Sequence, residues 1–415
     1  MTGLLSIYYH GEDIGTLTIT KGRRYTFSYK EEWLQRGDAI PISISLPLSP
    51  GEFDEEKSMS FFSNLLPEST IREKLAKHFR ISEKDSYGLL EIIGGECAGA
   101  ISILPSEINF DKSGDYEEIP DEHLSDLLAE ISRRPLFAGD KGVRLSLAGA
   151  QDKLPIYHED GKFFLPKGDY ASTHIIKTPI SDEYPYSVIN EAFCMCLAKE
   201  LGLPVPEVII CRNAHEPFYL IERYDRVVGD DGSIIRLHQE DFCQALGVSP
   251  EQKYEEDGGP SLVDCFNLIG EYSINPAVDK QHLLKWVMFN LLVGNSDSHA
   301  KNLSFLYIDG DKSLSPFYDL LCTKIYPDLN DNFSMKIGKR RDVRYLSVRD
   351  WQKLAEEINV KYSIMPELSN ELMNGIDSKI SAIKDLICND KEEEKFIEGI
   401  IKIINQRSKS LLQIK

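Results

Sequence analysis

The sequence has only one pair of closely spaced cysteines, Cys194 and Cys196, and it lacks long apolar runs and an excess of basic residues. Its eight cysteines include no C-x-x-C pair, so we expect reduced thiols rather than a disulfide framework or a zinc site. The most apolar helical run, Leu283 to Val293, is short and contains Lys285 and Asn290. No basic segment followed by a long apolar one opens the sequence. We therefore expect no signal peptide, no membrane span or membrane partner, and a cytoplasmic location.

Basic residues are outnumbered, with 47 Lys and Arg against 67 Asp and Glu, which leaves a net charge of −20. This balance opposes unaided binding to nucleic acid or to an anionic membrane. One basic cluster is a local exception, formed by Lys336, Lys339, Arg340, Arg341 and Arg344. It either contacts phosphate groups or forms a solvated face, and we favour the solvated face.

Length and composition predict two or three folded domains. The chain has 415 residues, of which 42% are hydrophobic and 27% charged, as in ordinary globular proteins. Residues 1–105 combine strand and helix patterns and predict a small α+β module, and the acidic stretch after it predicts a linker at 106–120. Residues 121–238 are rich in strand patterns and residues 239–415 in helix patterns. We therefore expect an α+β protein with a β-rich lobe and an all-helical lobe.

The first module has recognisable local signals. A β-hairpin turning between His10 and Asp13 opens it, and Arg24 to Tyr29 and Pro41 to Leu46 are further predicted strands. A helical stretch follows and is interrupted near Pro67. The run Gly94 to Gly99 lacks the Lys-Ser or Lys-Thr of a phosphate-binding loop, so we expect a turn there.

The most informative segment, GNSDSHAKNLSFL, joins a predicted helix to a predicted strand. Gly294 ends the helix and Leu303 to Ile308 is the strand, so Asp297 and Asn302 lie on the loop, with His299 supporting it. Their spacing, D-x-x-x-x-N, is the one at which protein kinases place a catalytic base and a magnesium-binding amide. Alone, this spacing arises by chance in many chains.

A predicted hairpin returns a second carboxylate to that loop. Asp309-Gly310 marks its turn, and Tyr318-Asp319 stands at the end of its second strand. Mg²⁺ ions that bridge ATP phosphates need oxygen ligands from two directions. We predict that Asp297 takes the proton of the attacking hydroxyl and that Asn302 and Asp319 bind Mg²⁺. The alternative is that these are turn, cap and loop residues.

Three upstream segments supply groups that an ATP site needs. Lys177 ends the apolar strand HIIK, in the manner of the kinase lysine that pairs with the α and β phosphates. Glu191, on the next helix, either holds that lysine or is an ordinary helix glutamate. SLAGAQDK is a candidate loop over the phosphates, and Glu222 to Asp225 ends a strand where adenine would bond to the backbone.

In this order, the segments resemble the HipA family of toxin kinases. The matching motifs are SLAGAQDKLP, THIIKTPI, ERYDR, HQEDFCQALG, GNSDSHAKNLSFL and FYDLLCT. Residues 1–105 resemble the amino-terminal module of that family. The resemblance covers nearly the whole chain and implies a two-lobed protein-kinase-like fold and a serine/threonine kinase that uses ATP and Mg²⁺.

The resemblance also implies residue roles. Asp297 is the catalytic proton acceptor, and Asn302 and Asp319 are the metal ligands. The nucleotide contacts would come from the phosphate loop, the strand lysine, the adenine strand and the catalytic segments: Ala148, Gly149, Ala150, Gln151, Asp152, Lys153, Lys177, Glu222, Arg223, Tyr224, His299, Ala300, Lys301, Asn302, Tyr318 and Asp319. Ser146 matches the serine whose autophosphorylation expels the loop and inactivates the kinase. A plain turn hydroxyl is the alternative for Ser146.

The partners implied by the resemblance are a small dimeric helix-turn-helix antitoxin of the HipB type and, mainly through it, operator DNA. The implied substrate is an aminoacyl-tRNA synthetase, foremost glutamyl-tRNA synthetase, whose phosphorylation stops translation and leads to growth arrest or persistence. Two other functions stay open at this point. One is a catalytically idle co-repressor that keeps the kinase fold, and the other is a phosphotransferase acting on a small molecule.

Overall fold

The structure is a computed structural model that describes residues 3–20, 22, 24–108, 110, 114–131, 136, 146, 148–149, 151–181, 183–212 and 217–414. The chain divides into two compact units, which are taken in turn. Unit 1 comprises residues Met1–Thr178, Arg212–Glu251 and Leu306–Gly310, and unit 2 comprises Pro179–Cys211, Gln252–Phe305 and Asp311–Lys415. Unit 1 thus combines the predicted amino-terminal module with most of the predicted β-rich segment.

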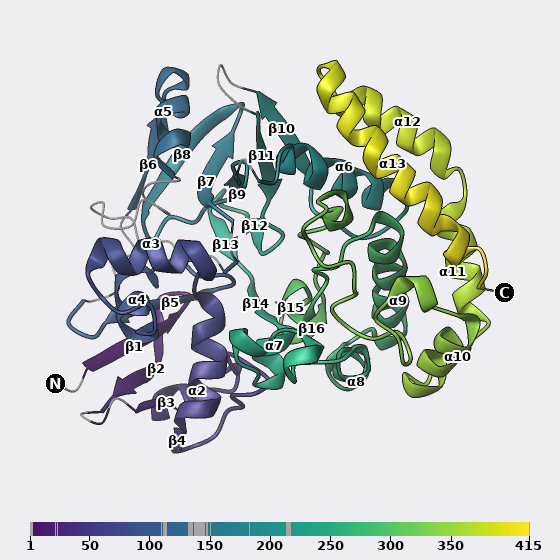
Figure 1. Ribbon diagram of the computed structural model, residues 1–415. Coiled ribbons are helices and arrows are strands. Elements are labelled where there is room, and N and C mark those ends of the chain that lie inside the picture. Colours follow the sequence, from purple (N-terminus) through teal and green to yellow (C-terminus); the bar gives the residue numbers. More distant parts are fainter. Residues whose placement is uncertain are drawn as a thin grey trace. The chain divides into compact units, whose positions relative to one another are not determined.

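A five-stranded sheet in the order β4-β3-β2-β1-β5 opens unit 1 (Figure 1). The strands are β1 (Gly3–Tyr9), β2 (Glu12–Ile19), β3 (Tyr25–Tyr29), β4 (Glu52–Phe53) and β5 (Ile101–Pro105). The predicted hairpin is present, because His10 and Gly11 take positive φ values of 49° and 80° in a two-residue turn that suits the strand twist. The predicted strand at Pro41 to Leu46 is wrong, since this segment forms a turn closed by a bridge between Ser43 and Leu46.

Four helices accompany this sheet: α1 (Glu31–Leu34), α2 (Glu55–Phe62), α3 (Ser69–Phe79) and α4 (Ser86–Ile93). α2 is extended by the 3-10 turn η1 (Ser63–Leu65), and the chain breaks before α3 at Pro67, as predicted. Phe27 of β3 and Phe61 and Phe62 of α2 are fully buried. The aromatic side chains thus hold α2 on the sheet.

A six-stranded sheet in the order β10-β11-β9-β7-β8-β6 follows. Its strands are β6 (Gly114–Ile119), β7 (Lys153–Glu159), β8 (Lys162–Gly168), β9 (His174–Lys177), β10 (Val208–Arg212) and β11 (Pro217–Glu222), and α5 (Asp121–Ile131) comes directly after β6. Strand β6 lies within the segment predicted as a linker and pairs antiparallel with β8. Among its acidic residues, Tyr116 stacks on Tyr157 and Ile119 is buried, so the strand is held by packed side chains as well as by its backbone pairing.

Shorter strands complete the β structure. β12 (Arg226–Val228) pairs with β13 (Ile234–Arg236), and β14 (His238–Asp241), β15 (Ser304–Ile308) and β16 (Asp311–Leu314) form a sheet with β15 in the middle. The predicted turn between β15 and β16 is present, with Asp309 and Gly310 at φ values of 51° and 86°. After β14, the short helix α7 (Phe242–Leu246) begins at a capping box made by Asp241 and Gln244.

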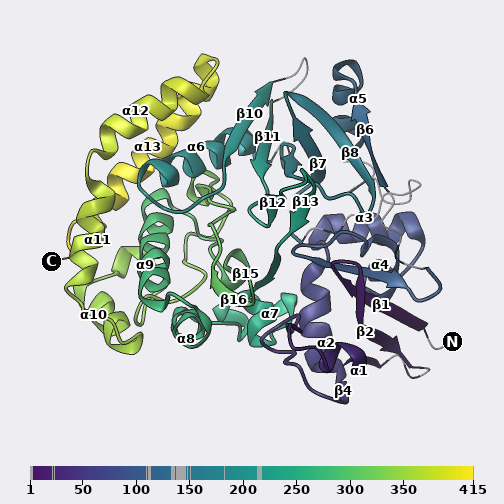
Figure 2. The ribbon, with the colours of Figure 1, turned by 180° about the vertical axis from the view of Figure 1, so that it is seen from behind.

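Unit 2 is mainly helical, with α6 (Ser187–Glu200), α8 (Leu262–Tyr272), α9 (Pro276–Val293), α10 (Val348–Glu357), α11 (Ile364–Met373), α12 (Ile376–Ile387) and α13 (Lys391–Leu411). Helix α9 is buried on nearly all sides from Leu283 onward and packs against α8, α11 and α13 (Figure 2). Helices α12 and α13 lie side by side in both views. Within the described residues, none of the helices combines the length and apolar character needed to cross a membrane.

Candidate functional site

The end of α9 places the loop that carries the predicted catalytic residues. Gly294 caps the helix at φ 78°, and a Cβ atom there would lie 2.9 Å from the Cβ atom of Lys324. Only glycine satisfies both the left-handed backbone and the close approach. Buried Asn290 and Asn295 continue the cap, because the Asn295 backbone N–H donates to the Asn290 carbonyl (2.9 Å) and its side-chain amide donates to Asn290 Oδ1 (2.8 Å).

The loop from Asn295 to Asn302 is tied by its own backbone. The Asp297 N–H donates to Asn295 Oδ1 (3.1 Å), the His299 N–H to the Asp297 carbonyl (3.0 Å), and the Asn302 N–H to the His299 carbonyl (3.0 Å). The Asn302 side-chain amide also reaches the Asp297 carbonyl at 3.4 Å. These bonds bring Asp297 and Asn302 together, as their spacing predicts. Ala300 and Lys301, in the 3-10 turn η5 (Ala300–Asn302), are buried beside them.

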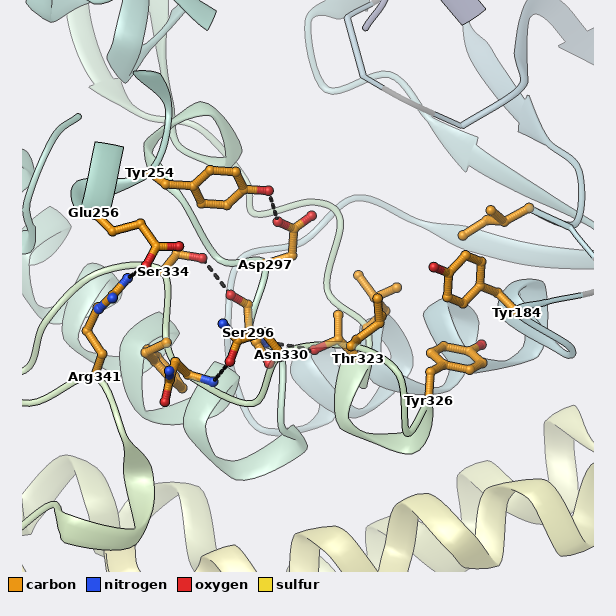
Figure 3. A pocket seen from close by; sticks show the side chains of 15 residues that line it. Tyr184, Tyr254, Glu256, Ser296, Asp297, Thr323, Tyr326, Asn330, Ser334 and Arg341 are labelled. Carbon is orange, nitrogen blue, oxygen red and sulfur yellow. Dashed lines mark hydrogen bonds and ion pairs between the residues drawn. The ribbon is translucent and has the colours of Figure 1, made fainter. Parts of the chain in front are cut away.

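Asp297 stands out from this loop because its side chain is half exposed while the residues after it are buried. Its Oδ1 atom accepts a hydrogen bond from the Tyr254 hydroxyl at 2.6 Å and lies 3.8 Å from His299 Nε2. The Tyr254 and His299 rings meet edge to face, 5.2 Å apart, and Figure 3 shows the Tyr254 hydroxyl directed at Asp297. One carboxylate oxygen is thus positioned by neighbours while the side chain stays open to an acceptor.

The segment after β16 approaches the same loop. The Tyr318 hydroxyl donates to the Lys301 carbonyl (2.9 Å), and the Asn295 amide donates to the Asp319 carbonyl (3.4 Å). Asp319 has a φ of 54°, an unusual backbone position for an aspartate. The prediction that Tyr318-Asp319 ends the second strand of the hairpin is wrong, because β16 ends four residues earlier at Leu314. An irregular segment carries Asp319 instead.

Asn190, on α6, is a positioning residue that the sequence did not reveal. Its side chain is fully buried and exchanges two hydrogen bonds with the backbone of Cys322: its amide donates to the carbonyl (3.0 Å), and its Oδ1 accepts from the N–H (2.7 Å). Thr323, next in the chain, accepts from the Ser296 N–H at 2.8 Å. Together they fix the segment after Asp319 against the catalytic loop. The two partners lie too far apart in sequence for a local signal.

The donor set fits a magnesium ion that is held partly by phosphates. The Asn302 amide nitrogen donates a hydrogen bond to the Asp297 carbonyl, whereas its Oδ1 has no hydrogen bond to any described residue. This oxygen is therefore available as a hard ligand for a metal ion. Within the described ranges, no three His, Cys, Asp or Glu side chains gather into a metal-binding cluster. Mg²⁺ is usually held by one or two carboxylates and by substrate phosphates rather than by a complete protein cage. Asp319 and Asn302 match that pattern.

In unit 1, the predicted phosphate loop is held by the amino-terminal helices. Ser146 is fully buried, with its Oγ donating to the Leu65 carbonyl (2.8 Å) and its N–H to the Glu96 carbonyl (2.8 Å). The Gly149 carbonyl accepts from the Glu68 N–H at 3.0 Å. Ala148, Gln151 and Asp152 lie on the same loop, and Lys153 begins β7. Lys153 Nζ donates to the Ala148 carbonyl, Gln151 donates to the Thr178 carbonyl (2.8 Å), and Asp152 pairs with Lys74 (3.2 Å). Ala150 lies outside the described residues.

Lys177 ends β9, as predicted, and is buried. In the sheet it is the register partner of Lys153 on β7 and of Tyr219 on β11, and its Nζ lies 6.0 Å from the centre of the Tyr219 ring. A buried ammonium over an aromatic face is stabilised by a cation–π contact. Glu191, proposed as its holder, is a buried residue of α6 in unit 2.

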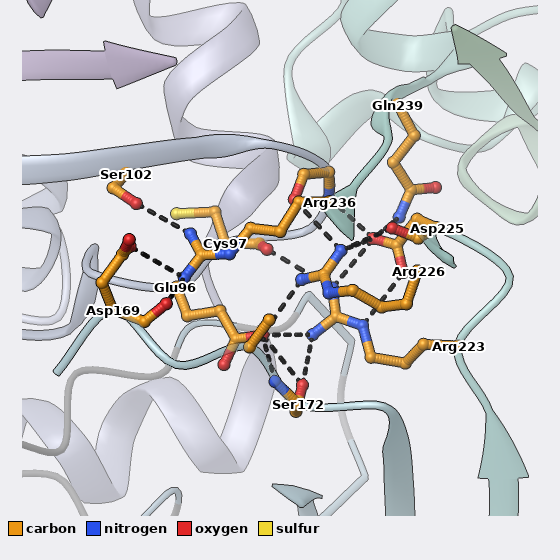
Figure 4. Close-up of polar contacts among 12 residues, drawn as sticks. Glu96, Cys97, Ser102, Asp169, Ser172, Arg223, Asp225, Arg226, Arg236 and Gln239 are labelled. Carbon is orange, nitrogen blue, oxygen red and sulfur yellow. Dashed lines mark hydrogen bonds and ion pairs between the residues drawn. The ribbon is translucent and has the colours of Figure 1, made fainter. Parts of the chain in front are cut away.

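The predicted adenine segment runs into a buried charge network (Figure 4). Glu222 is exposed at the end of β11, whereas Arg223 is buried and its guanidinium contacts Asp225 (2.8 Å) and Glu96 (3.2 Å). Arg226 joins the network through Glu96 at 3.0 Å. Side-chain contact of Arg223 with adenine therefore competes with these ion pairs, and an adenine contact there would use the backbone. The Tyr224 hydroxyl donates a hydrogen bond to Gln239 Oε1.

Burial alone would raise the pKa of Glu96, but the three guanidinium groups of Arg223, Arg226 and Arg236 outweigh it and lower that pKa to about 2. Glu96 belongs to the glycine-rich run that we predicted to be a turn and not a phosphate loop. Its Oε1 atom also accepts from the Ser172 N–H (3.1 Å) and hydroxyl (2.9 Å). Glu96 is therefore an anionic centre of the fold of unit 1.

Comparison with known proteins identifies the family of the chain. The family model described as the HipA-like C-terminal domain matches residues 145–381, and that of the HipA N-terminal domain matches residues 5–104. The chain belongs to the HipA family. The fold predicted for it, α+β and kinase-like, is confirmed by the solved structure described next.

HipA relatives resemble the chain along most of its length. The Serine/threonine-protein kinase toxin HipA of Shewanella oneidensis is 32% identical over 77% of this chain and 74% of its own. A Sinorhizobium fredii protein named "Putative kinase Y4mE" is 40% identical over 92% of this chain and 91% of its own. The solved complex of Shewanella oneidensis MR-1 HipA, HipB and operator DNA matches with a TM-score of 0.84 and 27% identity, covering 98% of this chain and 96% of that one.

Proposed function

We propose that this HipA-family protein is a serine/threonine kinase that uses ATP and Mg²⁺ and acts as a growth-arresting toxin. The observation that carries the proposal is the catalytic loop, on which an exposed, oriented Asp297 carboxylate lies beside Asn302 with a free amide oxygen. The kinase names of its relatives support the same class of reaction. An idle co-repressor would have no use for this arrangement.

Each site residue has a task in phosphoryl transfer. Bound ATP would supply the phosphoryl group, and Mg²⁺ would neutralise its developing charge. Asp297 accepts the proton of the acceptor hydroxyl and orients its oxygen, while Asn302 and Asp319 hold the metal. Lys177 and the loop from Ala148 to Lys153 bind the phosphates. Catalysis then consists mainly of positioning and charge neutralisation.

Labelled ATP tests the proposal directly. The purified protein, Mg²⁺ and a cell extract should yield labelled protein, and Asp297→Asn should lower the rate by about 100-fold or more, the usual contribution of a general base. Asp309→Asn is the matched control, because Asp309 is an exposed turn residue of the neighbouring hairpin and asparagine tolerates its positive φ. Absence of label from every protein would contradict the kinase proposal, and label on a metabolite would favour small-molecule transfer.

Autophosphorylation of Ser146 is part of the proposal, and its surroundings explain the consequence. The Ser146 hydroxyl donates to the Leu65 carbonyl oxygen in a fully buried position. A phosphate replaces that donor with acceptor oxygens carrying a charge of about −1.5 to −2, which the carbonyl repels and the core cannot solvate. The modified loop must leave. Ser146→Ala should lose self-labelling and keep substrate labelling, and unchanged self-labelling would exclude this site.

The proposed partners are a HipB-like helix-turn-helix antitoxin, operator DNA reached mainly through it, and an aminoacyl-tRNA synthetase as substrate. The Shewanella complex supports the antitoxin and the DNA. In the basic cluster, Lys336 pairs with Glu255 (2.9 Å) and Arg341 with Glu256 (2.5 Å), which supports a solvated, ion-paired face rather than a DNA contact. Purified glutamyl-tRNA synthetase should become labelled and lose aminoacylation activity; an unlabelled synthetase would exclude this target.

A further inference from the structure

A pocket of about 400 Å³ opens in unit 2 beside the proposed catalytic base (Figure 3). Its lining combines the loop of Asp297, the segment after Asp319, and residues from three other places, among them Tyr184, Tyr254 and Arg341. Its volume falls in the range of about 300 to 1,000 Å³ that is usual for ligand pockets.

The end of the pocket at Asp297 is polar and fixed. Ser296 donates its N–H to Thr323 Oγ1 (2.8 Å) and shares a hydroxyl contact with it (3.0 Å), and its carbonyl accepts from the Ser334 hydroxyl (2.6 Å). A hydroxyl that enters at this end meets the Asp297 carboxylate. This end therefore suits the residue that receives the phosphate.

Much of the remaining lining is apolar. Leu321, Leu329 and Phe333 contribute alkyl and aromatic surface, and the rings of Tyr184 and Tyr326 meet edge to face with their centres 5.3 Å apart. The Tyr326 hydroxyl is occupied, because it donates to the Pro185 carbonyl at 3.1 Å. Binding of an apolar side chain to such a surface is favourable, because it removes apolar area of both partners from water.

The charges in the lining do not suit a phosphate or an acidic ligand. Among the described lining residues, Arg341 is the single cation, and it pairs with Glu256 at 2.5 Å, so the two largely neutralise each other. Asp297 adds a negative charge that repels a triphosphate. The pocket therefore fits the acceptor of the phosphoryl group better than the donor.

We propose that this pocket binds a large apolar residue of the protein substrate within two positions of the phosphorylated serine or threonine. The proposal rests on the kinase function above and adds its sequence preference. Filling an apolar pocket discriminates by about 10- to 200-fold, so this preference is measurable in kcat/KM.

The test maps the phosphorylated site in a protein that the wild-type enzyme labels in extract. The site should have a large apolar neighbour within two positions, and replacing that neighbour with asparagine should lower kcat/KM at least tenfold, through KM for the acceptor. The enzyme variant Leu329→Asn should lower it similarly and should be insensitive to the neighbour. Leu386→Asn is the matched control, since Leu386 is 79% exposed on α12 and outside the pocket.

Two results would overturn the pocket proposal and leave the kinase proposal intact: a labelled site without a large apolar neighbour, or a Leu329→Asn enzyme that still distinguishes the two acceptors. Absence of any labelled protein would refute the kinase proposal and, with it, the pocket. Unchanged KM for ATP in Leu329→Asn shows that the variant is folded.

A separate observation, the hydrogen bond from Tyr254 to Asp297 Oδ1, carries a second inference. The segment that holds Tyr254 is fastened at its next two residues: Glu255 accepts from the Lys336 N–H (2.6 Å) and pairs with its ammonium group (2.9 Å), and Glu256 pairs with Arg341 (2.5 Å). Lys336 and Arg341 of the basic cluster thus hold the segment that carries Tyr254. We infer that Tyr254 is a positioning residue that occupies one carboxylate oxygen and directs the other to the acceptor hydroxyl.

Tyr254→Phe keeps the ring and removes this hydrogen bond. Hydrogen bonds to charged groups are among the stronger ones in proteins, so kcat should fall at least tenfold while KM for ATP and for the acceptor stays unchanged. A residue with only a structural role would alter KM or the melting temperature instead. Tyr345→Phe, at a 64% exposed tyrosine of the same unit, is the control. A kcat within twofold of wild type would overturn the inference.

Discussion

Removal of the Glu96 charge is the sharpest test of the forces that hold unit 1 together. Glu96 is 3% exposed, and its Oε1 atom contacts Arg223 at 3.2 Å, Arg226 at 3.0 Å and both polar groups of Ser172. Glu96→Gln keeps the shape of the side chain and removes its charge. Three guanidinium groups then lose a shared counter-ion in a site that water cannot enter.

The expected loss follows from the pKa. A displacement of the Glu96 pKa from its usual 4.5 to about 2, at about 1.4 kcal/mol per pKa unit, corresponds to about 3 kcal/mol of folding free energy. A depressed carboxylate pKa stabilises the fold above pH 4.5, and this contribution disappears as the pH falls from 4.5 to 2. The difference between wild type and Glu96→Gln should therefore be complete at pH 7 and shrink below pH 4.5.

Urea unfolding followed by circular dichroism measures this difference at several pH values. Glu118→Gln is the matched control in the same unit, because Glu118 makes an ion pair with Lys162 at 2.9 Å while half exposed. Surface pairs contribute at most about 1 kcal/mol. A Glu96→Gln protein no less stable than Glu118→Gln, or a difference that does not shrink in acid, would refute this account of the network.

Three further substitutions have defined outcomes. Gly294→Ala should destabilise the protein by at least about 1 kcal/mol and lower phosphotransfer, because its φ is 78° and its Cβ would lie 2.9 Å from the Cβ of Lys324; a melting temperature equal to wild type would contradict this. Asn190→Ala should cost about 1–3 kcal/mol, because it leaves the buried backbone groups of Cys322 unpaired, and kcat should fall with it; unaltered kcat would mean that this clamp does not position Asp319. Asp241→Ala should cost about 1 kcal/mol through loss of the α7 cap without changing kcat, and urea unfolding and the kinase assay together check both parts.

Local features of the site were predictable because local preferences set them. Glycine at position 294 ends a helix through its freedom at positive φ, and Asp309-Gly310 suits a two-residue hairpin turn for the same reason. A five-residue spacing on a short loop keeps Asp297 and Asn302 within reach of each other whatever surrounds them. Lys177 ends its strand because the apolar pattern ends there.

Predictions failed where the surroundings outweighed the local pattern. Pro41 to Leu46 alternates like a strand but forms a turn, with the Ser43 hydroxyl donating to buried Glu240 (2.5 Å). The acidic composition around Glu117 is typical of a linker, but this segment forms β6 and pairs with β8. At the edge of the sheet its backbone N–H and C=O groups find hydrogen-bond partners. The motif HQEDFCQALG is largely buried and helps to hold this turn, because its Glu240 also accepts a hydrogen bond from the Ile44 N–H.

The sequence by itself determined the family and predicted the loop of Asp297 and Asn302 and a kinase class of chemistry, since these depend on residue types at short, fixed spacings. Only the tertiary structure decided which distant side chains support them. Tyr254 reaches Asp297 across 43 residues, Arg223 reaches Glu96 across 127, and Asn190 reaches Cys322 across 132. Contacts over such separations depend on how whole helices and sheets pack, and no local backbone preference encodes that packing.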